Sequence, residues 1–340
     1  LEYYESPGVL PTVERSSLRH DLYRRDFTIN TLAFSLNSKG FGRLSDYFGG
    51  QQDIQDQFVR VLHNLSFVED PTRVFRAIRF EQRLGFRLAP HTENLIRSAV
   101  RMNMPDLVGG KRLFNELVLI MKEKEPAGAL DRMSAMGLLR FIHPGLKLLP
   151  ETERIIHETT QVLAWFRLLY LDDQCEQWQV YFLSLCDTLK TDGFTGVCRR
   201  LEMPVRLAAK LAEGRRKVSS ILESIHRKLK RGPEIRRSEI YQWLHGLPLE
   251  MLLYLAAKGV RDEVRRFVSL YLTRLRQVHC GLDGEALRSL GLCSGPQFRS
   301  VMDRLLVARL DGEVSSDVEE HALAVSMIKS KKSAIASINS

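Results

Sequence analysis

The chain has 340 residues, of which 44% are hydrophobic, so it is long enough to form more than one packed domain. The absence of an uncharged apolar run of about 18 residues, and of a basic-then-apolar opening, predicts neither a membrane span nor a signal peptide, and we expect a cytoplasmic protein. The net charge of +9 favours a polyanionic partner, and the five cysteines lack the C-x-x-C spacing of a zinc site.

The first 48 residues combine short strand-like segments, at Tyr3-Tyr4 and from Phe41 to Phe48, with one helix expected to begin near Phe27. This mixture indicates the last part of an α/β domain. Because the chain opens at Leu1, inside a strand-like segment, we expect it to be a fragment of a longer protein.

From Gln52 onward, apolar residues recur every three or four positions with almost no alternation, which predicts helices. Breaks such as Glu125-Pro126, Gly232-Pro233 and Gly295-Pro296 divide this region into helices of ordinary length. We therefore expect a mainly α protein.

Two short motifs precede or open the helical region. In RRDFTIN, which begins at Arg24, Asp26 is placed to cap a helix, so a purely structural helix start is one interpretation. In FGGQQDIQDQFVR, Gly49-Gly50 frees the backbone and Asp53 can cap the next helix. Taken alone, the second motif is an ordinary hinge.

A third motif, EDPTRVFRAIRF, places Asp70 and Pro71 at the cap and first turn of a helix. Beyond this carboxylate, arginines recur at every third position: Arg73, Arg76 and Arg79. Neighbouring guanidinium groups repel one another unless an anion or a carboxylate lies opposite, so a polyphosphate or an RNA backbone is a suitable counterpart. An exposed, solvated arginine face is the alternative.

In order and spacing, these three segments resemble motifs B, C and D of the class II tRNA nucleotidyltransferases and bacterial poly(A) polymerases. GGKRLFNELVLIM resembles motif E of the same family through Arg112 and Glu116, which the resemblance makes a brace for the neck helices. The resemblance extends from residue 1 to about 320, and four motifs in the right order are more specific than any one. It implies a partial catalytic head over 1–48, a base-recognition neck over 49–125, a helical body over 126–235 and a tRNA-binding helical tail over 236–340.

The resemblance also implies the activity: addition of AMP, or of CMP and AMP, from ATP and CTP to tRNA 3′ ends without a template. The nucleotide would be held by Arg24, Arg25, Asp26, Asn30, Asp70, Arg73, Arg76 and Arg79. Asp70 would accept from the exocyclic amine of adenine or cytosine and Arg73 would donate to the adjacent ring nitrogen, while Arg76 or Arg79 would hold phosphate or brace Asp70. ATP and CTP both satisfy this pair, so A-adding, CCA-adding and poly(A) polymerase activities stay open.

The family's reaction uses two Mg²⁺ ions, held mainly by an Asp-x-Asp pair. No such pair occurs before Arg24, and Glu2 alone matches the family's further acidic residue on the last strand of the head. We therefore expect the main metal ligands to lie outside this chain and the chain itself to be inactive. A non-catalytic helical RNA-binding module with a nucleotide-reading neck is the alternative function.

Clusters of basic residues in the helical region are candidates for holding the acceptor end and T arm of tRNA, and local pairing with glutamates is the alternative. With Gly295, which lies before a helix start, the candidates are Arg215, Arg216, Lys217, Lys228, Lys230 and Arg231. The pair His20-Asp21 lacks the further ligands of an HD phosphohydrolase. The sequence does not indicate an oligomeric state.

Overall fold

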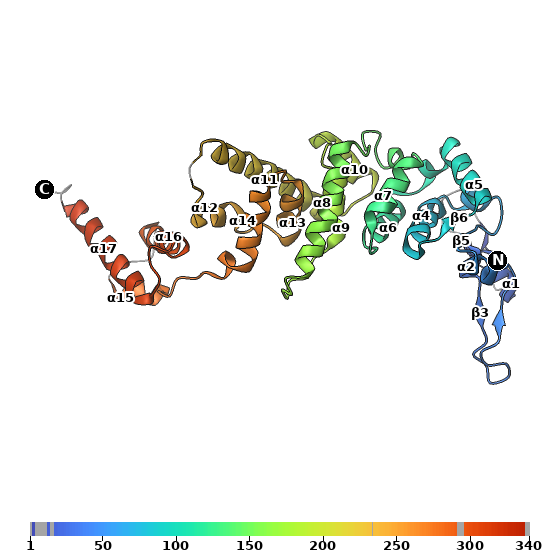
Figure 1. Cartoon of the computed structure of the whole chain (residues 1–340), viewed down its shortest axis with the longest axis horizontal. Coiled ribbons are helices and arrows are strands. Elements are labelled where there is room, and N and C mark those ends of the chain that lie inside the picture. Colours follow the sequence, from blue (N-terminus) through green and yellow to red (C-terminus); the bar gives the residue numbers. More distant parts are fainter. Residues whose placement is uncertain (1, 4–11, 14–16, 233, 291–295, 337–340) are drawn as a thin grey trace. The chain divides into compact units, whose positions relative to one another are not determined.

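The computed structural model describes residues 1–340 except 1, 4–11, 14–16, 233, 291–295 and 337–340 (Figure 1). The chain divides into two compact units, Leu1–Arg215 and Arg216–Ser340. Helices dominate both units, so the mainly α fold expected from the sequence is confirmed. The four predicted domain boundaries remain predictions. In the part that the structure describes, no helix is long and apolar enough to cross a membrane.

The first unit begins with small sheets and short helices, in this order: β1 (Glu2–Tyr3), β2 (Thr12–Val13), α1 (Leu18–Tyr23), the 3₁₀ turn η1 (Thr28–Asn30), β3 (Ala33–Phe34), β4 (Leu44–Ser45), α2 (Gly50–Gln55) and β5 (Phe58–Val59). Strands β1 and β2 pair antiparallel, as do β3 and β4, whose hairpin extends away from its neighbours in Figure 1.

The helix expected near Phe27 is absent, and the prediction was wrong. Phe27 has an extended backbone, is completely buried and forms an antiparallel bridge with Val61, which prevents a helix from starting there. Only the single turn η1 follows, and the preceding helix is α1, capped by the hydroxyl of Ser17.

The cap of α2 also differs from the prediction. Asp46, rather than Asp53, accepts from the backbone N–H groups at the start of this helix, from residues 48 to 51 at 2.9–3.3 Å. Asp53 is buried inside α2, where it accepts from the Thr28 hydroxyl at 2.6 Å and from Arg60 Nε at 2.9 Å. Asp53 thus joins the helix to the segments on both sides of it.

The remaining elements of the first unit are α3 (Ser66–Glu69), α4 (Thr72–Leu84), β6 (Arg87–Leu88), α5 (Pro90–Arg101), η2 (Met104–Leu107), α6 (Gly110–Met121), α7 (Pro126–Ala135), η3 (Leu139–Phe141), α8 (Pro150–Arg167), α9 (Gln177–Leu185) and α10 (Thr191–Arg200). Helix α4 packs against α6 and α7, and β5 pairs with β6 in parallel. The buried side chains of Phe75, Ile78, Leu113 and Leu117 form the interior between α4 and α6 and hold the two helices in register.

Helix α11 (Val205–Lys230) runs across the division between the units. The second unit continues with α12 (Arg237–Leu244), α13 (Leu249–Lys258), α14 (Asp262–Thr273), η4 (Leu275–Gln277), α15 (Gly284–Ser289), α16 (Pro296–Asp311) and α17 (Asp317–Ala336). Helix α13 is buried along almost its whole length. Near the end, Glu320 is fully buried and accepts from Gly281 N at 2.8 Å and from Arg309 at 2.9 Å, which connects α17 to the segment between η4 and α15 and to α16.

Candidate functional site

The site forms where α4 starts. Asp70 precedes the helix, and its Oδ1 accepts from the Thr72 backbone N–H at 3.1 Å and from the Thr72 hydroxyl at 2.6 Å. Arg112, one turn into α6, donates from Nη2 to both carboxylate oxygens of Asp70, at 3.0 and 2.8 Å. The Asp70 carboxylate is thereby fixed in orientation. A carboxylate oxygen accepts in more than one direction, so Oδ2 can still accept from a ligand.

Arg73 lies beside Asp70 and is 5% exposed. Its Nη1 donates to the Ser66 hydroxyl at 2.9 Å, and its Nη2 donates to the backbone carbonyl of Arg24 at 2.8 Å. Glu69, one helical turn away, lies 4.0 Å from Nη1. These contacts fix the guanidinium plane before any ligand arrives, and they use two of its five N–H groups.

Arg76 contacts a different partner from the one expected. It donates from Nε at 2.8 Å and from Nη2 at 2.5 Å to Oδ2 of Asp26, and its Nη1 lies 3.5 Å from Glu116. Burial lowers the pKa of Arg76. The charges and hydrogen bonds of Asp26 and Glu116 together raise this pKa by more than burial lowers it, so it lies above its usual value. The structure shows Arg112, and neither Arg76 nor Arg79, as the partner of Asp70.

Asp26 points into the protein. Its Oδ1 accepts from the Phe27 N–H at 3.0 Å and from the side-chain amide of Asn30 at 2.8 Å, and its Oδ2 accepts from Arg76. Asp26 and Asn30, both predicted to hold the nucleotide, thus contact each other. In this arrangement the Asp26 carboxylate connects the first segment of the chain to α4.

Arg79 is buried among carboxylates of α6 and the residues after it. Its Nη1 lies 3.9 Å from Glu116 and its Nε lies 4.0 Å from Glu123. Among the described residues, Arg79 Nε and Glu116 Oε2 have no hydrogen-bond partner. Burial raises the pKa of Glu116 above its usual value, although Arg76 and Arg79 lower it.

The arginine series therefore lies against carboxylates, and the alternative of an exposed, solvated face is wrong because Arg73 and Arg79 are buried.

Arg25 is the exposed member of the predicted set, and its neighbour Arg24 is half-buried. Asp21, on α1, lies 2.6 Å from Nη2 of Arg24 and 3.5 Å from Nη2 of Arg25. The hydrogen bond from Arg24, more than any other interaction, holds the pKa of Asp21 below its usual value. Since Arg25 keeps 47% of its side-chain surface exposed, it can reach a ligand in solvent.

Two predicted residues cannot be placed fully. The backbone of Glu2 lies in β1, but its side chain is outside what the structure describes, and Gly295 lies outside the described residues. Over the described part of the chain, no group of three or more His, Cys, Asp or Glu side chains could hold a metal ion.

Two of the basic candidates have structural contacts. Arg215 donates to the backbone carbonyls of Asp187, at 2.7 Å, and Leu189, and it lies over the Phe194 ring with 5.2 Å to the centroid. Lys228 donates to Glu239 at 2.7 Å. The prediction that Arg215 is an RNA contact does not fit this geometry. The other helical candidates are exposed: Arg216, Lys217, Lys230 and Arg231.

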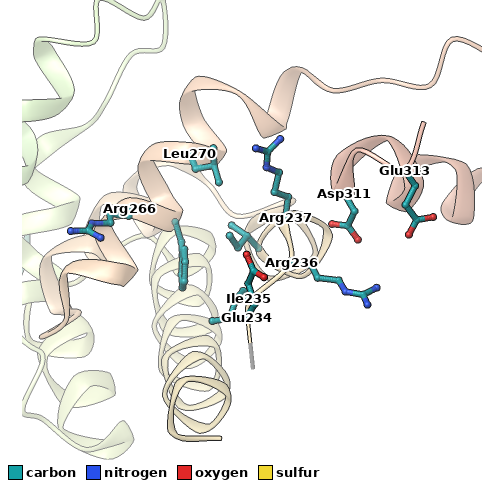
Figure 2. A pocket seen from close by; sticks show the side chains of 10 residues that line it. Glu234, Ile235, Arg236, Arg237, Arg266, Leu270, Asp311 and Glu313 are labelled. Carbon is teal, nitrogen blue, oxygen red and sulfur yellow. The ribbon is translucent and has the colours of Figure 1, made fainter. Parts of the chain in front are cut away.

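The second unit has a pocket of about 860 Å³ between α12, α14 and α16, shown in Figure 2. Its apolar lining comes from Ile235, Ile240, Phe267 and Leu270, its positive charges are on Arg236, Arg237 and Arg266, and its negative charges are on Glu234, Asp311 and Glu313. Asp311, at one edge, accepts from the backbone N–H and the hydroxyl of Ser238 at 2.9 and 2.8 Å. Figure 2 shows the three guanidinium groups pointing in different directions, so they do not converge on one small ion.

Comparison with known proteins identifies two matching domains: residues 1–60 match the poly A polymerase head domain, and residues 85–149 match the probable RNA and SrmB-binding site of polymerase A. The chain is 56% identical over 330 residues to the A-adding tRNA nucleotidyltransferase of Geobacter sulfurreducens, covering 97% of this chain and 38% of that protein. It is 33% identical over 279 residues to the A-adding enzyme of Aquifex aeolicus, covering 82% of this chain and 32% of that protein. The chain thus spans about a third of the length of these curated relatives.

Solved structures show the same relationship. A CCA-adding enzyme in an apo form superposes with a TM-score of 0.78 and 30% identity, covering 95% of this chain and 74% of that one. The Thermotoga maritima CCA-adding enzyme complexed with tRNA superposes with a TM-score of 0.76 and 29% identity, covering 92% of this chain and 75% of that one.

Proposed function

This chain belongs to the family of tRNA nucleotidyltransferases and bacterial poly(A) polymerases, and from that premise we propose that the protein adds AMP, or CMP and AMP, to the 3′ end of tRNA. The observation that carries the proposal is the pre-arranged pair of Asp70 and Arg73 at the start of α4. ATP and CTP complexes of CCA-adding enzymes are among the similar structures, which supports these nucleotides as substrates. An enzyme of this kind works on tRNA in the cytoplasm.

The proposed base selection follows from hydrogen-bond polarity. The fixed carboxylate of Asp70 accepts from the exocyclic amine of adenine or cytosine, and Arg73 donates to the ring nitrogen beside it. Guanine and uracil present a carbonyl and an N–H in these places, so each would leave a charged group unpaired at a cost of about 1–3 kcal/mol per contact. Arg112 contributes by orienting Asp70.

Nucleotide binding tests this selection. The chain is expected to bind ATP and CTP more tightly than GTP and UTP in calorimetric titrations. Asp70→Asn should reduce this preference about tenfold or more, because an amide offers a donor as well as an acceptor. Asp106→Asn, at an exposed carboxylate of η2, is the matched control and should keep the preference. Equal binding of all four nucleotides by the unaltered chain would refute base selection by this pair.

Transfer itself is tested on the gene product as its source expresses it, with magnesium, tRNA ending in CC, and ATP or CTP separately. Incorporation of AMP alone identifies an A-adding enzyme, and incorporation of both nucleotides identifies a CCA-adding enzyme. Binding of tRNA with no incorporation would favour the non-catalytic RNA-binding module. Because the described residues do not fit a metal pair, the proposed roles of this chain are nucleotide selection and RNA holding.

We assign the triphosphate to Arg24, which is half-buried, and to Arg25, which is exposed. Arg24 and Arg25 are paired with the surface carboxylate of Asp21, and a phosphate can replace such a partner at little cost because exposed ion pairs are weak. A ribose contact by Asp26 would require the carboxylate to leave Arg76.

We assign part of the tRNA to the arginine-lined pocket of the second unit, together with the exposed residues Lys230 and Arg231. Changing Arg236, Arg237 and Arg266 to alanine together should weaken tRNA binding. The negative slope of the logarithm of the association constant against the logarithm of the salt concentration should become shallower by about 0.7–0.9 per lost phosphate contact. The same three positions changed to lysine keep the charge and should keep the slope. An unchanged slope in the alanine variant would remove the pocket from the RNA-binding surface.

A further inference from the structure

The imidazole of His63 lies at the centre of the contacts that hold Arg73. Its Nε2 is 3.4 Å from Oε2 of Glu69, the same oxygen that lies 4.0 Å from Nη1 of Arg73. The His63 side chain keeps 15% of its surface exposed, against 36% for Glu69. The ring is therefore a partly buried neighbour that limits the positions open to the more exposed glutamate side chain.

The other two contacts of Arg73 also come from residues joined to His63. The backbone carbonyl of His63 accepts from the Ser66 N–H at 3.2 Å, and the Ser66 hydroxyl accepts from Arg73. The ring of Tyr23 stacks on the His63 ring with 5.1 Å between centroids and 28° between planes. Tyr23 immediately precedes Arg24, whose carbonyl is the third oxygen that contacts Arg73.

The surroundings of His63 lower its pKa and so favour the neutral form of the ring. Burial lowers the pKa of His63 below its usual value, the nearby Glu69 charge raises it, and the Arg73 charge lowers it. A neutral imidazole with its proton on Nε2 can direct that N–H toward Glu69 without adding a positive charge next to Arg73. The ring thus orients the carboxylate without competing for it electrostatically.

We propose that His63 is a positioning residue for base selection, whose ring fixes Glu69 and the Tyr23-Arg24 segment so that the Arg73 guanidinium keeps one orientation. The role rests on the proposed function of Arg73 as a base reader. His63 does not need to touch the nucleotide. It acts on selectivity by limiting the rotation of a buried guanidinium that would otherwise satisfy a wrong base.

The test compares His63→Ala with His63→Gln, because a glutamine amide places an N–H close to the position of Nε2. In calorimetric titrations, the ratio of the ATP binding constant to the GTP binding constant should fall about tenfold in His63→Ala. In His63→Gln it should fall less than about threefold. The nuclear magnetic resonance order parameter of the Arg73 Nε–H bond, measured without nucleotide and assigned with Arg73→Lys, should fall in His63→Ala and recover in His63→Gln. His157→Gln, at an exposed histidine of α8, should change neither quantity.

The two measurements separate this proposal from the function on which it rests. If the unaltered chain shows no preference for ATP over GTP, the proposed function fails, and the Arg73 order parameter still decides whether His63 positions the guanidinium. An unchanged order parameter and an unchanged preference in a folded His63→Ala variant would overturn the proposal. Equal losses in the alanine and glutamine variants would also overturn it, because the role requires the N–H toward Glu69.

Discussion

Replacing Asp26 by alanine is expected to lower the unfolding free energy of the first unit by about 3 kcal/mol, the lower end of the range for breaking a buried ion pair. The Asp26 carboxylate is 7% exposed and accepts from Arg76, from Asn30 and from the Phe27 N–H. Without the Asp26 carboxylate, the Arg76 guanidinium keeps only its longer contact with Glu116. The lower end applies because 30% of the Arg76 side chain is exposed and can be solvated.

Hydrogen exchange followed by mass spectrometry measures this effect unit by unit, with peptides of α4 as the reporters. Asp21→Ala is the control, since Asp21 pairs with two arginines on the surface, where ion pairs contribute little. The double variant Asp26→Leu with Arg76→Met should recover much of the loss, because no charge is then left without a partner. Faster exchange confined to residues 18–30, with α4 unaffected, would contradict a connection between these segments.

Gly110→Ala adds one methyl group near the site, and of the alanine substitutions at glycines there it is expected to lower stability the most. A Cβ at Gly110 would lie 2.3 Å from the backbone oxygen of Arg200 and 2.8 Å from Cγ of Glu202, so the start of α6 and the end of α10 would have to separate. We expect a loss of about 3 kcal/mol in unfolding free energy, typical of strong overpacking. The displacement would also move Arg112 relative to Asp70, and ATP binding should weaken with stability.

Gly109→Ala is the matched control one residue earlier. A Cβ there meets no atom within 4 Å and the backbone conformation is not left-handed, so stability and ATP binding should change little. Urea unfolding and calorimetric titration of both variants make the comparison. Similar losses at the two positions would show that the start of α6 responds to side-chain size in general, and that the contact with residues 200–202 is not the cause.

The sequence predicted the parts of the fold that depend on local pattern. The three- and four-residue spacing of apolar side chains identified the helices, and Asp70 with Pro71 marked the start of α4. The cap of α2 was assigned to Asp53 because the helix was expected to follow this residue; α2 begins earlier, at Gly50, so the carboxylate on its N-terminal side is that of Asp46. Phe27 was placed in a helix because its bridge to Val61 depends on a residue 34 positions later.

The candidate site was predicted in its residues but not in its pairings. The spacing of Arg73, Arg76 and Arg79 indicated opposing negative charge, and the structure supplies it from Asp26, Glu69, Glu116 and Glu123. Which carboxylate meets which arginine depends on how α4 packs against α6, and no local pattern encodes that packing. The pairing of Arg112 with Asp70 was missed for the same reason. The position of His63 beside Glu69 was missed because it depends on how the chain turns between β5 and α3, where no regular spacing brings side chains together.

The buried pair of Arg79 and Glu116 constrains how this protein can change over evolutionary time. Each residue leaves one polar atom without a hydrogen bond, so an apolar pair of similar size would be at least as stable. Glu116 also lies 3.5 Å from Arg76, and Arg79 also lies 4.0 Å from Glu123, so the loss of either residue leaves the other with one remaining partner. The first substitution therefore costs less than the loss of about 3–5 kcal/mol expected for a buried charge with no partner, and the second removes that cost. We therefore expect these two positions to change together among descendants, whether or not either residue contributes to function.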